Sequence, residues 1–545
     1  MKSVRMILNQ FTVGKKIHWP LLVFLVLFLN VKLVVKLLAI LIIYCLQPDF
    51  RFGFNKKNLR LPLFYPLMIV LAIVNAILLG QFVQANYLVV LLFGIGFWAA
   101  CILAVHQLKG IVESTDADIL SQTIAIFFLL NVFVSLLQFG AIIWETGALN
   151  PFRYQGNYQK YFISTGDYIK GISFDTSTTN AILNAFGIIF FLYKRNWLLV
   201  LLCTATLLFT ASNLVNILLF LTLLFLFIFH SSREQKSVIV ICTAMLVLFM
   251  SKVSPQNNQY AANVLEKAFQ IHESGKKEQE RKLDIRQMPE DSLTADQRKE
   301  KIALLYLDSL RRVIAKREQK LPEKIAVVET AFHEEKPFIP QPSIHSAPFQ
   351  NRDDTNAYRK ELLQFAEQKK IEEKAEESYA NTSLPGKAIA CLQTGKYFLL
   401  HPYRLLTGAG LGNFSSKMAF KATALKFAGG FPQRLAYINP DFSANHLSLY
   451  TYFFSKRANA HSITNTPNSV YDQLIGEYGL LGLAAFFLFY VAFFARQYKK
   501  LTYGIPLLFL LLGFFFIDYW FEQLSIVILF ELLLFLNLKE TNPAL

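Results

Sequence analysis

Residues 86–105 read NYLVVLLFGIGFWAACILAV, twenty consecutive positions without a charged side chain. An α-helix of this length crosses the roughly 30 Å hydrocarbon core of a bilayer. The whole chain of 545 residues has a similar character, since 54% of its residues are hydrophobic and only 17% are charged. Soluble domains carry about 25% charged residues. Lipid is therefore the main solvent of this protein, and a soluble globular enzyme is excluded.

Eleven further spans can be assigned. Long apolar runs occupy 61–80, 119–145 and 172–193, and shorter ones occupy 197–211, 214–229, 237–251, 479–495, 504–520 and 523–538. The run 20–46 is too long for one ordinary helix and contains Lys32 and Lys36, so we divide it into a hairpin that turns near Asn30 and Lys32. The sequence predicts an all-α, polytopic membrane protein with about 12 transmembrane helices, including a first span that is retained.

The basic residues predict the orientation of these spans. With twelve spans, one face receives nearly all the Lys and Arg of the short loops: Lys2, Arg5, Lys15, Lys16, Arg51, Lys56, Lys57, Arg60, Lys109, Lys194, Arg195, Arg233, Lys236, Arg496, Lys499, Lys500 and Lys539. The short turns at 80–86, around Ser212 and around Trp520 carry neither residue. The positive-inside rule makes the basic face cytoplasmic. Both termini are then cytoplasmic, and the loops 146–171 and 253–478 lie outside the cytoplasm.

Three regions follow from this topology. Residues 1–252 form an N-terminal membrane bundle of about nine spans with the short external loop 146–171, and 479–545 form a C-terminal bundle of about three spans. Between spans 9 and 10, residues 253–478 form a large external, periplasmic loop. Its first half, 257–382, is rich in Glu, Lys, Gln and Arg and predicts solvated helices. Its second half, 385–478, is rich in aromatic residues and Gly, which favours a packed surface close to the membrane.

Several classes of function are disfavoured by what the sequence lacks. The net charge of +16 comes from basic residues beside apolar spans, an arrangement typical of topology signals and of attraction for anionic lipids, not of nucleic-acid binding. The sequence has no phosphate-binding Walker loop, zinc-binding His pair or Ser nucleophile elbow. Four of the five cysteines lie in apolar runs, which leaves no intrachain disulfide framework.

The first candidate site lies in the external segment 150–170, where basic residues alternate with tyrosines: Arg153, Tyr154, Lys160 and Lys170. Cations at this level can bind a pyrophosphate held among the lipid headgroups, and tyrosines can stack on sugars. An aromatic belt with snorkelling bases is the alternative. The second candidate is the segment GISFDTSTTN at 171–180, whose Asp175 and Asn180 should face the bundle interior or a wet cavity. A simple helix cap by Asp175 or Ser173 explains this segment equally well.

The third candidate consists of two motifs. Residues 401–414 read HPYRLLTGAGLGNF, and residues 468–482 read NSVYDQLIGEYGLLG and open a span. With the loop around Arg153, the helix after Gly171 and the segment FTASN at 209–213, they resemble the O-antigen ligase and polymerase superfamily in their order along most of the chain. The resemblance implies glycosyl transfer at the outer face of the bacterial inner membrane. The donor would be an undecaprenyl-diphosphate-linked glycan, and the acceptor either lipid A core or another lipid-linked repeat.

The residues and the resemblance together nominate a site. Candidate catalytic residues are Arg153, Arg404, His461, Asn468 and Glu477, and candidate substrate-binding residues are Tyr154, Lys160, Lys170, Asp175, Asn180, Asn213, Gly408 and Gly410. No metal or other cofactor is implied, because the leaving group is already a diphosphate whose charge arginines can meet. The expected partners are the lipid-linked glycan, the acceptor and membrane lipid.

The chain departs from the family pattern at two positions. Ligases have a His directly before the Asn of the second motif, whereas Pro467 precedes Asn468 here and His461 is seven residues away, which favours a polymerase slightly and leaves the general base unassigned. Many members have Ser-Arg at the positions that match 211–213, where this chain has Ala-Ser-Asn and so lacks a cation. Arg153 or Arg404 would have to supply the positive charge instead.

Structural explanations compete at each of these positions. Gly479 and Gly482 can permit the turn into a helix, Asn468 can cap one, Glu477 suits a helix N-terminus, and the histidines can simply pack. Two other functions remain open, a transporter or flippase of lipid-linked saccharides and a scaffold for envelope assembly.

Overall fold

The computed structural model describes residues 17–52, 54–55, 58–59, 61–153, 165–253, 384–425, 430–453 and 466–541. Within these ranges the regular structure is helical, apart from a two-residue strand β1 (Phe54–Asn55) paired antiparallel with β2 (Asn58–Leu59). The charged half of the large loop predicted at 257–382 lies outside the described residues. So do Tyr154, Lys160 and His461.

The described helices lie mostly on the predicted apolar runs, with a few in the predicted loop 385–478. They are α2 (Trp19–Phe28), α3 (Leu33–Leu46), α4 (Phe64–Leu78), α5 (Ala85–Ser114), α6 (Ala117–Thr146), α7 (Ser177–Tyr193), α8 (Trp197–Phe209), α9 (Asn213–Phe229), α10 (Arg233–Leu248), α16 (Gly386–Leu400), α17 (Lys417–Ala422), α18 (Pro440–Ala444), α19 (Leu447–Phe453), α20 (Val470–Ala485), α21 (Ala492–Ala495), α22 (Gly504–Phe514), α23 (Trp520–Gln523) and α24 (Ser525–Thr541). The hairpin expected in 20–46 is present, because α2 and α3 are separate helices. The side chain of Asn30 accepts a hydrogen bond from the Lys32 N–H in the turn between them (3.0 Å).

Within the described parts of the chain, four helical segments are long and apolar enough to cross a membrane: Ala85–Ser114, Ala117–Thr146, Arg233–Val253 and Val470–Lys500. Seven shorter helices in these parts are also apolar. Large hydrophobic side chains remain exposed on these helices, among them Leu92 (67% exposed) on α5 and Phe133 (59%) on α6. Exposed apolar faces of this extent are stable when lipid covers them. The helices therefore indicate a multi-pass membrane protein.

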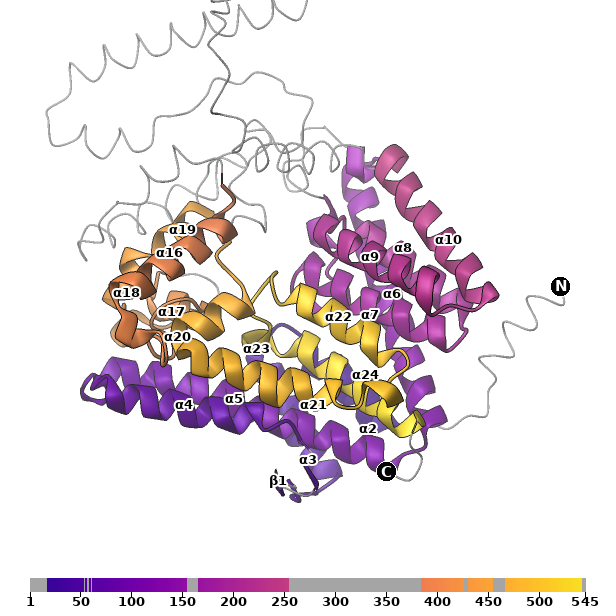
Figure 1. Cartoon of the computed structure of the whole chain (residues 1–545). Helices are drawn as coiled ribbons and strands as arrows, with labels where there is room; N and C mark the ends of the chain where they lie inside the picture. Colours follow the sequence, from indigo (N-terminus) through magenta and orange to yellow (C-terminus); the bar gives the residue numbers. More distant parts are fainter. Residues whose placement is uncertain are drawn as a thin grey trace, which may run out of the picture.

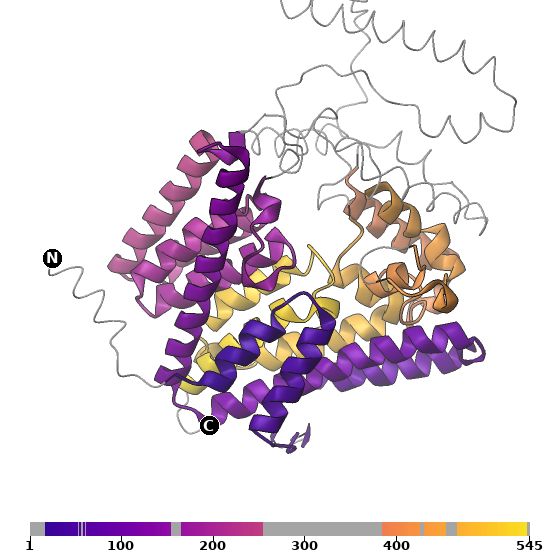
Figure 2. The ribbon, with the colours of Figure 1, turned by 180° about the vertical axis from the view of Figure 1, so that it is seen from behind.

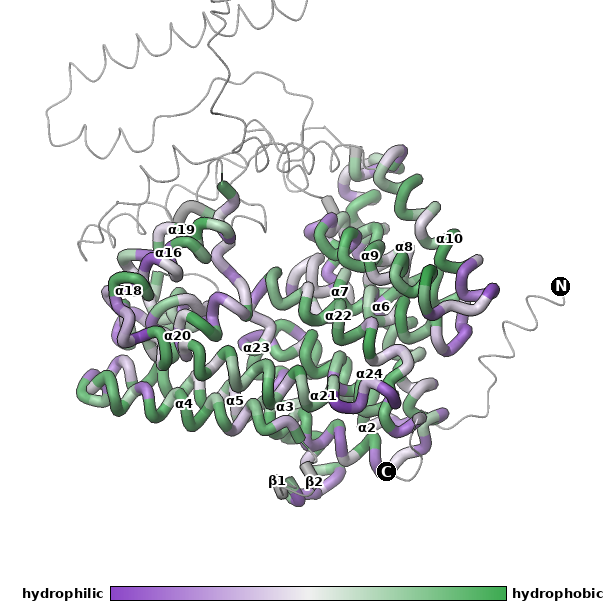
Figure 3. The backbone as a smooth tube through the Cα atoms, viewed as in Figure 1, coloured by the Kyte–Doolittle hydropathy of each residue, from purple (hydrophilic) through white to green (hydrophobic). Residues whose placement is uncertain are grey.

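The helices are arranged around a central C-terminal unit. Figure 1 shows α6–α10 on one side of α20–α24 and the short helices α16–α19 on the other, with the α4–α5 hairpin running beneath both α20 and α16–α19. Seen from behind in Figure 2, the α2–α3 hairpin lies beside the last segments of the chain. Figure 3 shows that hydrophobic residues predominate along the long helices of the bundle. Helices far apart in sequence thus meet around α20–α24.

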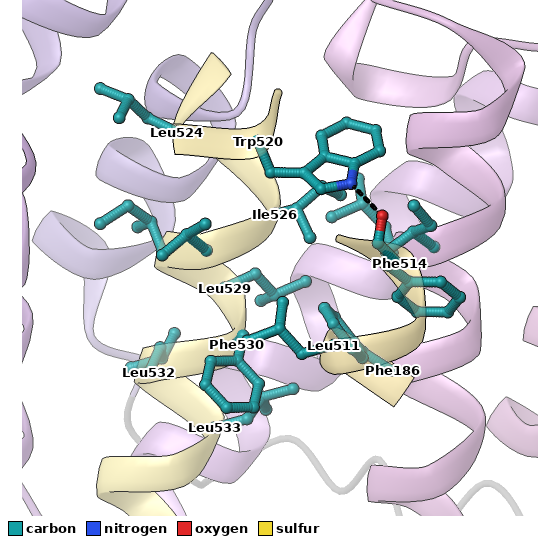
Figure 4. Close-up of a cluster of buried hydrophobic side chains, with 14 of the residues drawn as sticks. Phe186, Leu511, Phe514, Trp520, Leu524, Ile526, Leu529, Phe530, Leu532 and Leu533 are labelled. Carbon is teal, nitrogen blue, oxygen red and sulfur yellow. Dashed lines mark hydrogen bonds between the residues drawn. The ribbon is translucent and has the colours of Figure 1, made fainter. Parts of the chain in front are cut away.

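The centre of the bundle is α24. Its residues from Ser525 to Leu538 are all buried, as expected of a helix that is apolar all round. Figure 4 shows side chains of α24 packed against Phe186 of α7 and Leu511 of α22. The indole of Trp520 donates a hydrogen bond to the Phe514 carbonyl (2.7 Å) and closes the turn between α22 and α24. This packing holds α23 and its neighbours in a fixed position.

Several boundaries differ from the sequence-based prediction. Helix α5 continues to Ser114, nine residues beyond the predicted run 86–105, so Lys109 lies in the helix and not in a loop. Helix α22 ends at Phe514, before the predicted end at 520.

The span predicted at 479–495 begins nine residues earlier, at Val470, and Gly479 interrupts helix α20 instead of starting it. Hydropathy misses the first half of α20 because Asp472, Gln473 and Glu477 make it polar. These side chains are buried by tertiary contacts that hydropathy does not report.

Candidate functional site

The two sequence motifs interlock through their backbones. At the break in α20, the N–H of Leu480 donates to the Leu405 carbonyl (2.9 Å) and the N–H of Leu481 donates to the Leu406 carbonyl (3.1 Å). In the reverse direction, the N–H of Gly410 donates to the Glu477 carbonyl (2.9 Å). The loop 405–410 therefore supplies the hydrogen bonds that the broken helix cannot make itself.

The glycines of both motifs permit this close approach. Gly408 and Gly479 have φ of 75° and 65°. A Cβ on Gly408 would lie 2.6 Å from the backbone N of Tyr478, and a Cβ on Gly479 would lie 2.6 Å from that of Thr407. L-residues rarely adopt such φ values, and neither site has space for a side chain. The spacing of glycines in the motifs thus has a direct structural cause.

Glu477 is fixed beside this junction. Its side chain is fully buried, and its Oε1 accepts a hydrogen bond from the Phe414 N–H (3.4 Å). The amide of Asn75 on α4 donates to the Thr407 carbonyl (2.5 Å) and to the Glu477 carbonyl (3.5 Å). Glu477 therefore joins the glycine-rich loop to α20 and α4.

A group of charged residues lies next to Glu477, and we call it the acid–lysine cluster: Asp175, Lys417, Lys421, Asp518 and Glu522. Lys417 of α17 forms a salt bridge with Asp518, which follows α22 (Nζ to Oδ2, 2.7 Å). The side chain of Asn468 donates to the other oxygen of Asp518 (2.8 Å). Gln473 of α20 donates to Glu522 Oε1 on α23 (2.6 Å).

The charges of the cluster act strongly on one another. Burial lowers the pKa of Lys421, while Glu522, Asp175 and Asp518 act in the opposite direction. In the turn between α22 and α24, burial and the neighbouring Glu477 raise the pKa of Glu522 to about 8, against the effect of Lys421 and Lys417. Burial opposes the charge of Asp518, but Lys417 and the hydrogen bonds it receives keep its pKa below the usual value. The cluster thus pairs Asp518, whose pKa is lowered, with a lysine, and it holds a second acid, Glu522, whose pKa is raised to about 8.

Access to the cluster is uneven. Glu477 and Asp518 are buried, whereas Glu522, Lys421 and Asp175 are partly exposed. These three residues come from α23, α17 and the segment before α7. In such a pair the lysine can neutralise an anionic group, and the neighbouring accessible carboxylate can accept a proton.

Two further lysines, Lys36 and Lys387, form hydrogen bonds to the segments around the cluster. Lys36 of α3 is 3% exposed, and its ammonium donates to the Phe28 carbonyl (2.7 Å) and the Ser525 hydroxyl (2.6 Å) while facing the charge of Asp175. Lys387 of α16 donates to the carbonyls of Asn468 and Ile517 (2.8 Å for Ile517). Burial lowers the pKa of Lys387 to about 8, although Asp518 acts against this shift.

The structure brings part of the predicted site together. Asp175 belongs to the cluster, Asn468 holds Asp518, and Glu477 adjoins Glu522. Gly408 and Gly410 lie behind Glu477 in the interlocked loop. Arg404 ends a short 3₁₀ turn (Pro402–Arg404), and its guanidinium lies over the ring of Tyr403, 5.3 Å from the ring centre.

The remaining predicted residues lie at the ends of α6 to α9. The Asn180 side chain accepts from the amides of Asn131 and Asn184 (2.9 Å each) and donates to the Ser135 hydroxyl and the Ile169 carbonyl (3.0 Å each). These bonds hold the loop before α7 against α6. In that loop, the Lys170 carbonyl accepts from the Ser173 hydroxyl (2.9 Å).

Arg153 and Asn213 occur at a common end of the bundle. Arg153 ends the 3₁₀ turn Pro151–Arg153, and the ring of the preceding Phe152 packs against Phe139. Phe139 in turn stacks on Phe209, at the end of α8, four residues before Asn213 begins α9.

Sequence reasoning missed four of the five members of the cluster. Asp518 and Glu522 carried a usable signal, because the only charged residues between Gly504 and Leu538 are Asp518, Glu522 and Glu531. Ionisable residues in such an apolar stretch are candidates for function by default. Lys417 and Lys421 carried no such signal, since lysines are frequent throughout the chain.

Comparison with known proteins does not assign a function to this site. Comparison with protein-family models, curated proteins and solved structures finds no match. The likeness to the O-antigen ligase and polymerase superfamily therefore rests on the two motifs, the loop around Arg153, the helix after Gly171 and the segment 209–213, and on their order along the chain.

Proposed function

We propose that this protein is a membrane glycosyltransferase of surface-polysaccharide assembly. It transfers a glycan from an undecaprenyl-diphosphate carrier to an acceptor, as an O-antigen polymerase or ligase in the bacterial inner membrane. The observation that supports this function best is the acid–lysine cluster, in which lysines adjoin a partly exposed carboxylate where the two family-like motifs interlock. A transferase of this class needs cations for a diphosphate leaving group and polar groups for an acceptor hydroxyl.

The proposed topology agrees with this location. It has about 12 spans, cytoplasmic termini and a periplasmic loop at 253–478. The turn near Asn30, the start of α7, the insertion that contains α17, and the turn around Trp520 then all lie on the periplasmic side. The segments that contribute the cluster were assigned to this side from Lys and Arg in other loops. The meeting of these segments in the fold supports a site on one face of the bundle, and the proposed orientation makes that face external.

The chemistry needs no nucleotide sugar and no metal ion. The acceptor oxygen attacks the anomeric carbon, and the bond from that carbon to the diphosphate oxygen breaks with its electron pair staying on the diphosphate. Lys417 and Lys421 are the lysines whose charges act on the accessible Glu522, and they neutralise the developing negative charge. Asp518 and Asn468 keep Lys417 in position by fixing its partner.

Glycan analysis of a strain that lacks this protein tests the proposal. Accumulation of single lipid-linked repeats on the periplasmic side indicates a polymerase, and long polymers that stay on the lipid carrier indicate a ligase. Lipid-linked repeats retained on the cytoplasmic side would instead indicate a flippase. An unchanged set of lipid-linked and surface glycans would refute the transferase.

A further inference from the structure

The carboxylates near the cluster differ in how they are engaged. Glu477 is enclosed by the loop 412–416, and Asp518 is bound by Lys417 and Asn468. Asp175 accepts a hydrogen bond from the Thr179 hydroxyl (2.8 Å) and faces the charges of Lys36 and Lys421. Each of these three acids has a partner within the protein. Oε2 of Glu477 has no hydrogen-bond partner in the parts of the chain that the structure describes, but that side chain is fully buried and out of reach of another molecule.

Glu522 is in a different situation. It is partly exposed, and Gln473 donates to its Oε1 (2.6 Å). Among the described residues, no hydrogen bond to its Oε2 is formed. Gln473 therefore orients the carboxylate and leaves one oxygen able to accept a proton from another molecule.

The surroundings of Glu522 favour proton uptake. The charged groups that act on it are Glu477 of α20, Lys417 and Lys421 of α17, and Asp518. The tyrosines whose ionisation its charge affects are Tyr450 of α19, Tyr478 of α20 and Tyr519. The buried Glu477 carboxylate repels a negative charge on Glu522, whereas the two lysines stabilise one. A carboxylate under these opposing influences can exchange a proton during turnover.

We propose that Glu522 is the general base of the glycosyl transfer, and that Gln473 is the residue that positions it. The inference rests on the proposed function. Glu522 Oε2 accepts the proton of the acceptor hydroxyl as the acceptor oxygen bonds to the anomeric carbon. The diphosphate departs with the electron pair of the broken bond, and the proton later leaves Glu522 for water. The assignment fills the role that a His before Asn468 would hold in a ligase, where this chain has Pro467.

The pH dependence follows from the charge state that a base requires. Because burial and Glu477 raise the pKa of Glu522 to about 8, only a minority of the protein carries the ionised base at pH 7. Turnover should increase as the pH rises through about 8 and then level off.

The test uses full-length protein in lipid nanodiscs, with lipid-linked glycan extracted from the deletion strain as donor and either the same lipid-linked glycan or lipid A core as acceptor. Glu522→Gln keeps an oxygen for the Gln473 hydrogen bond but cannot take up the proton. We expect it to lose roughly 100- to 10,000-fold in kcat, the usual contribution of a general base. Donor binding, measured separately, should change little. The matched control is Glu234→Gln, an exposed acid in the first turn of α10, which should leave turnover unchanged.

Two more variants separate the base from a merely structural acid. Glu522→Asp retains a carboxylate and should keep part of the activity with a shifted pH profile. Gln473→Leu should lower kcat more than it alters KM, because it loosens the base without removing it. A Glu522→Gln protein that turns over like wild type, or a wild-type pH profile that is flat between about 7 and 9, would overturn the assignment. If wild-type protein transfers no glycan at all, the proposed function itself fails.

Discussion

The break in α20 allows a stability prediction that does not depend on function. Replacing Gly479 by Ala places a Cβ at a residue with φ of 65° and ψ of −161°. This backbone region is nearly exclusive to glycine, so the strain costs about 1–3 kcal/mol. The new methyl group would also lie 2.6 Å from the backbone N of Thr407, so the loop 405–410 has to move away.

Moving that loop weakens the bonds that it makes to α20. The Leu480 and Leu481 N–H groups would lose their carbonyl partners, at about 0.5–1.5 kcal/mol each. Together with the strain, Gly479→Ala should lower the free energy of unfolding by roughly 2–6 kcal/mol.

Gly80 provides a matched control. It also has a positive φ, 62°, but a Cβ there would meet no atom within 4 Å. Gly80→Ala should therefore cost only about 1–2 kcal/mol, the strain alone. The assay is chemical or thermal unfolding of both variants in the same detergent, followed by circular dichroism. Equal destabilisation of the two variants would refute the interlocked arrangement as the reason for glycine at position 479.

Three further predictions concern other parts of the molecule. Lys417→Ala should lower the free energy of unfolding by about 1–3 kcal/mol, because it leaves the buried Asp518 carboxylate without its cation, and Asp518→Asn in the same protein should restore part of the loss. Arg51→Ala removes the partner of Asp49 at the surface and should leave the unfolding midpoint nearly unchanged. An equal effect of Lys417→Ala and Arg51→Ala would contradict this account. Asn180→Ala should cost about 2–4 kcal/mol, because several buried groups lose their partner, whereas Asn86→Ala, which removes a single hydrogen bond to the Ala436 carbonyl, should cost clearly less in the same unfolding assay. Reporter fusions at Lys56, Arg195 and Leu545 should report the cytoplasm and a fusion at Gln319 the periplasm; a cytoplasmic signal at Gln319 would contradict the topology and the external site.

The fold could be predicted well where lipid dictates the sequence. A helix that faces hydrocarbon must be apolar over a minimum length, so runs such as 119–145 matched α6 within two residues, and the buried Lys36 correctly marked a hairpin. The prediction failed at the start of α20, because Asp472 and Glu477 lie in a helix whose first half is buried by protein. Hydropathy cannot distinguish such a polar buried segment from a loop.

The candidate site could be predicted only in part, for a related reason. Asp175, Asn468 and Glu477 stood out in short motifs beside apolar runs. Lys417 did not, because its significance depends on Asp518, which is 101 positions away and meets it only in the folded protein. The motif glycines were recognised as a pattern, but their cause lies in a backbone contact between two separate segments. No local pattern reports such a contact.

The central position of α24 has a consequence for biogenesis. Helix α24 is synthesised after all the other described helices yet occupies the middle of the bundle, where its Glu531 receives a hydrogen bond from Tyr65, a residue synthesised 466 positions earlier. Until α24 is inserted, the surfaces of α5, α6 and α7 that contact it lack this partner, and Tyr65 lacks the carboxylate of Glu531. During synthesis, the surfaces of the N-terminal half that α24 later buries must therefore contact lipid or the insertion machinery. A stop codon after α22 would leave these surfaces in that state, so we expect quality-control proteases to remove the shortened chain although most of its spans are intact.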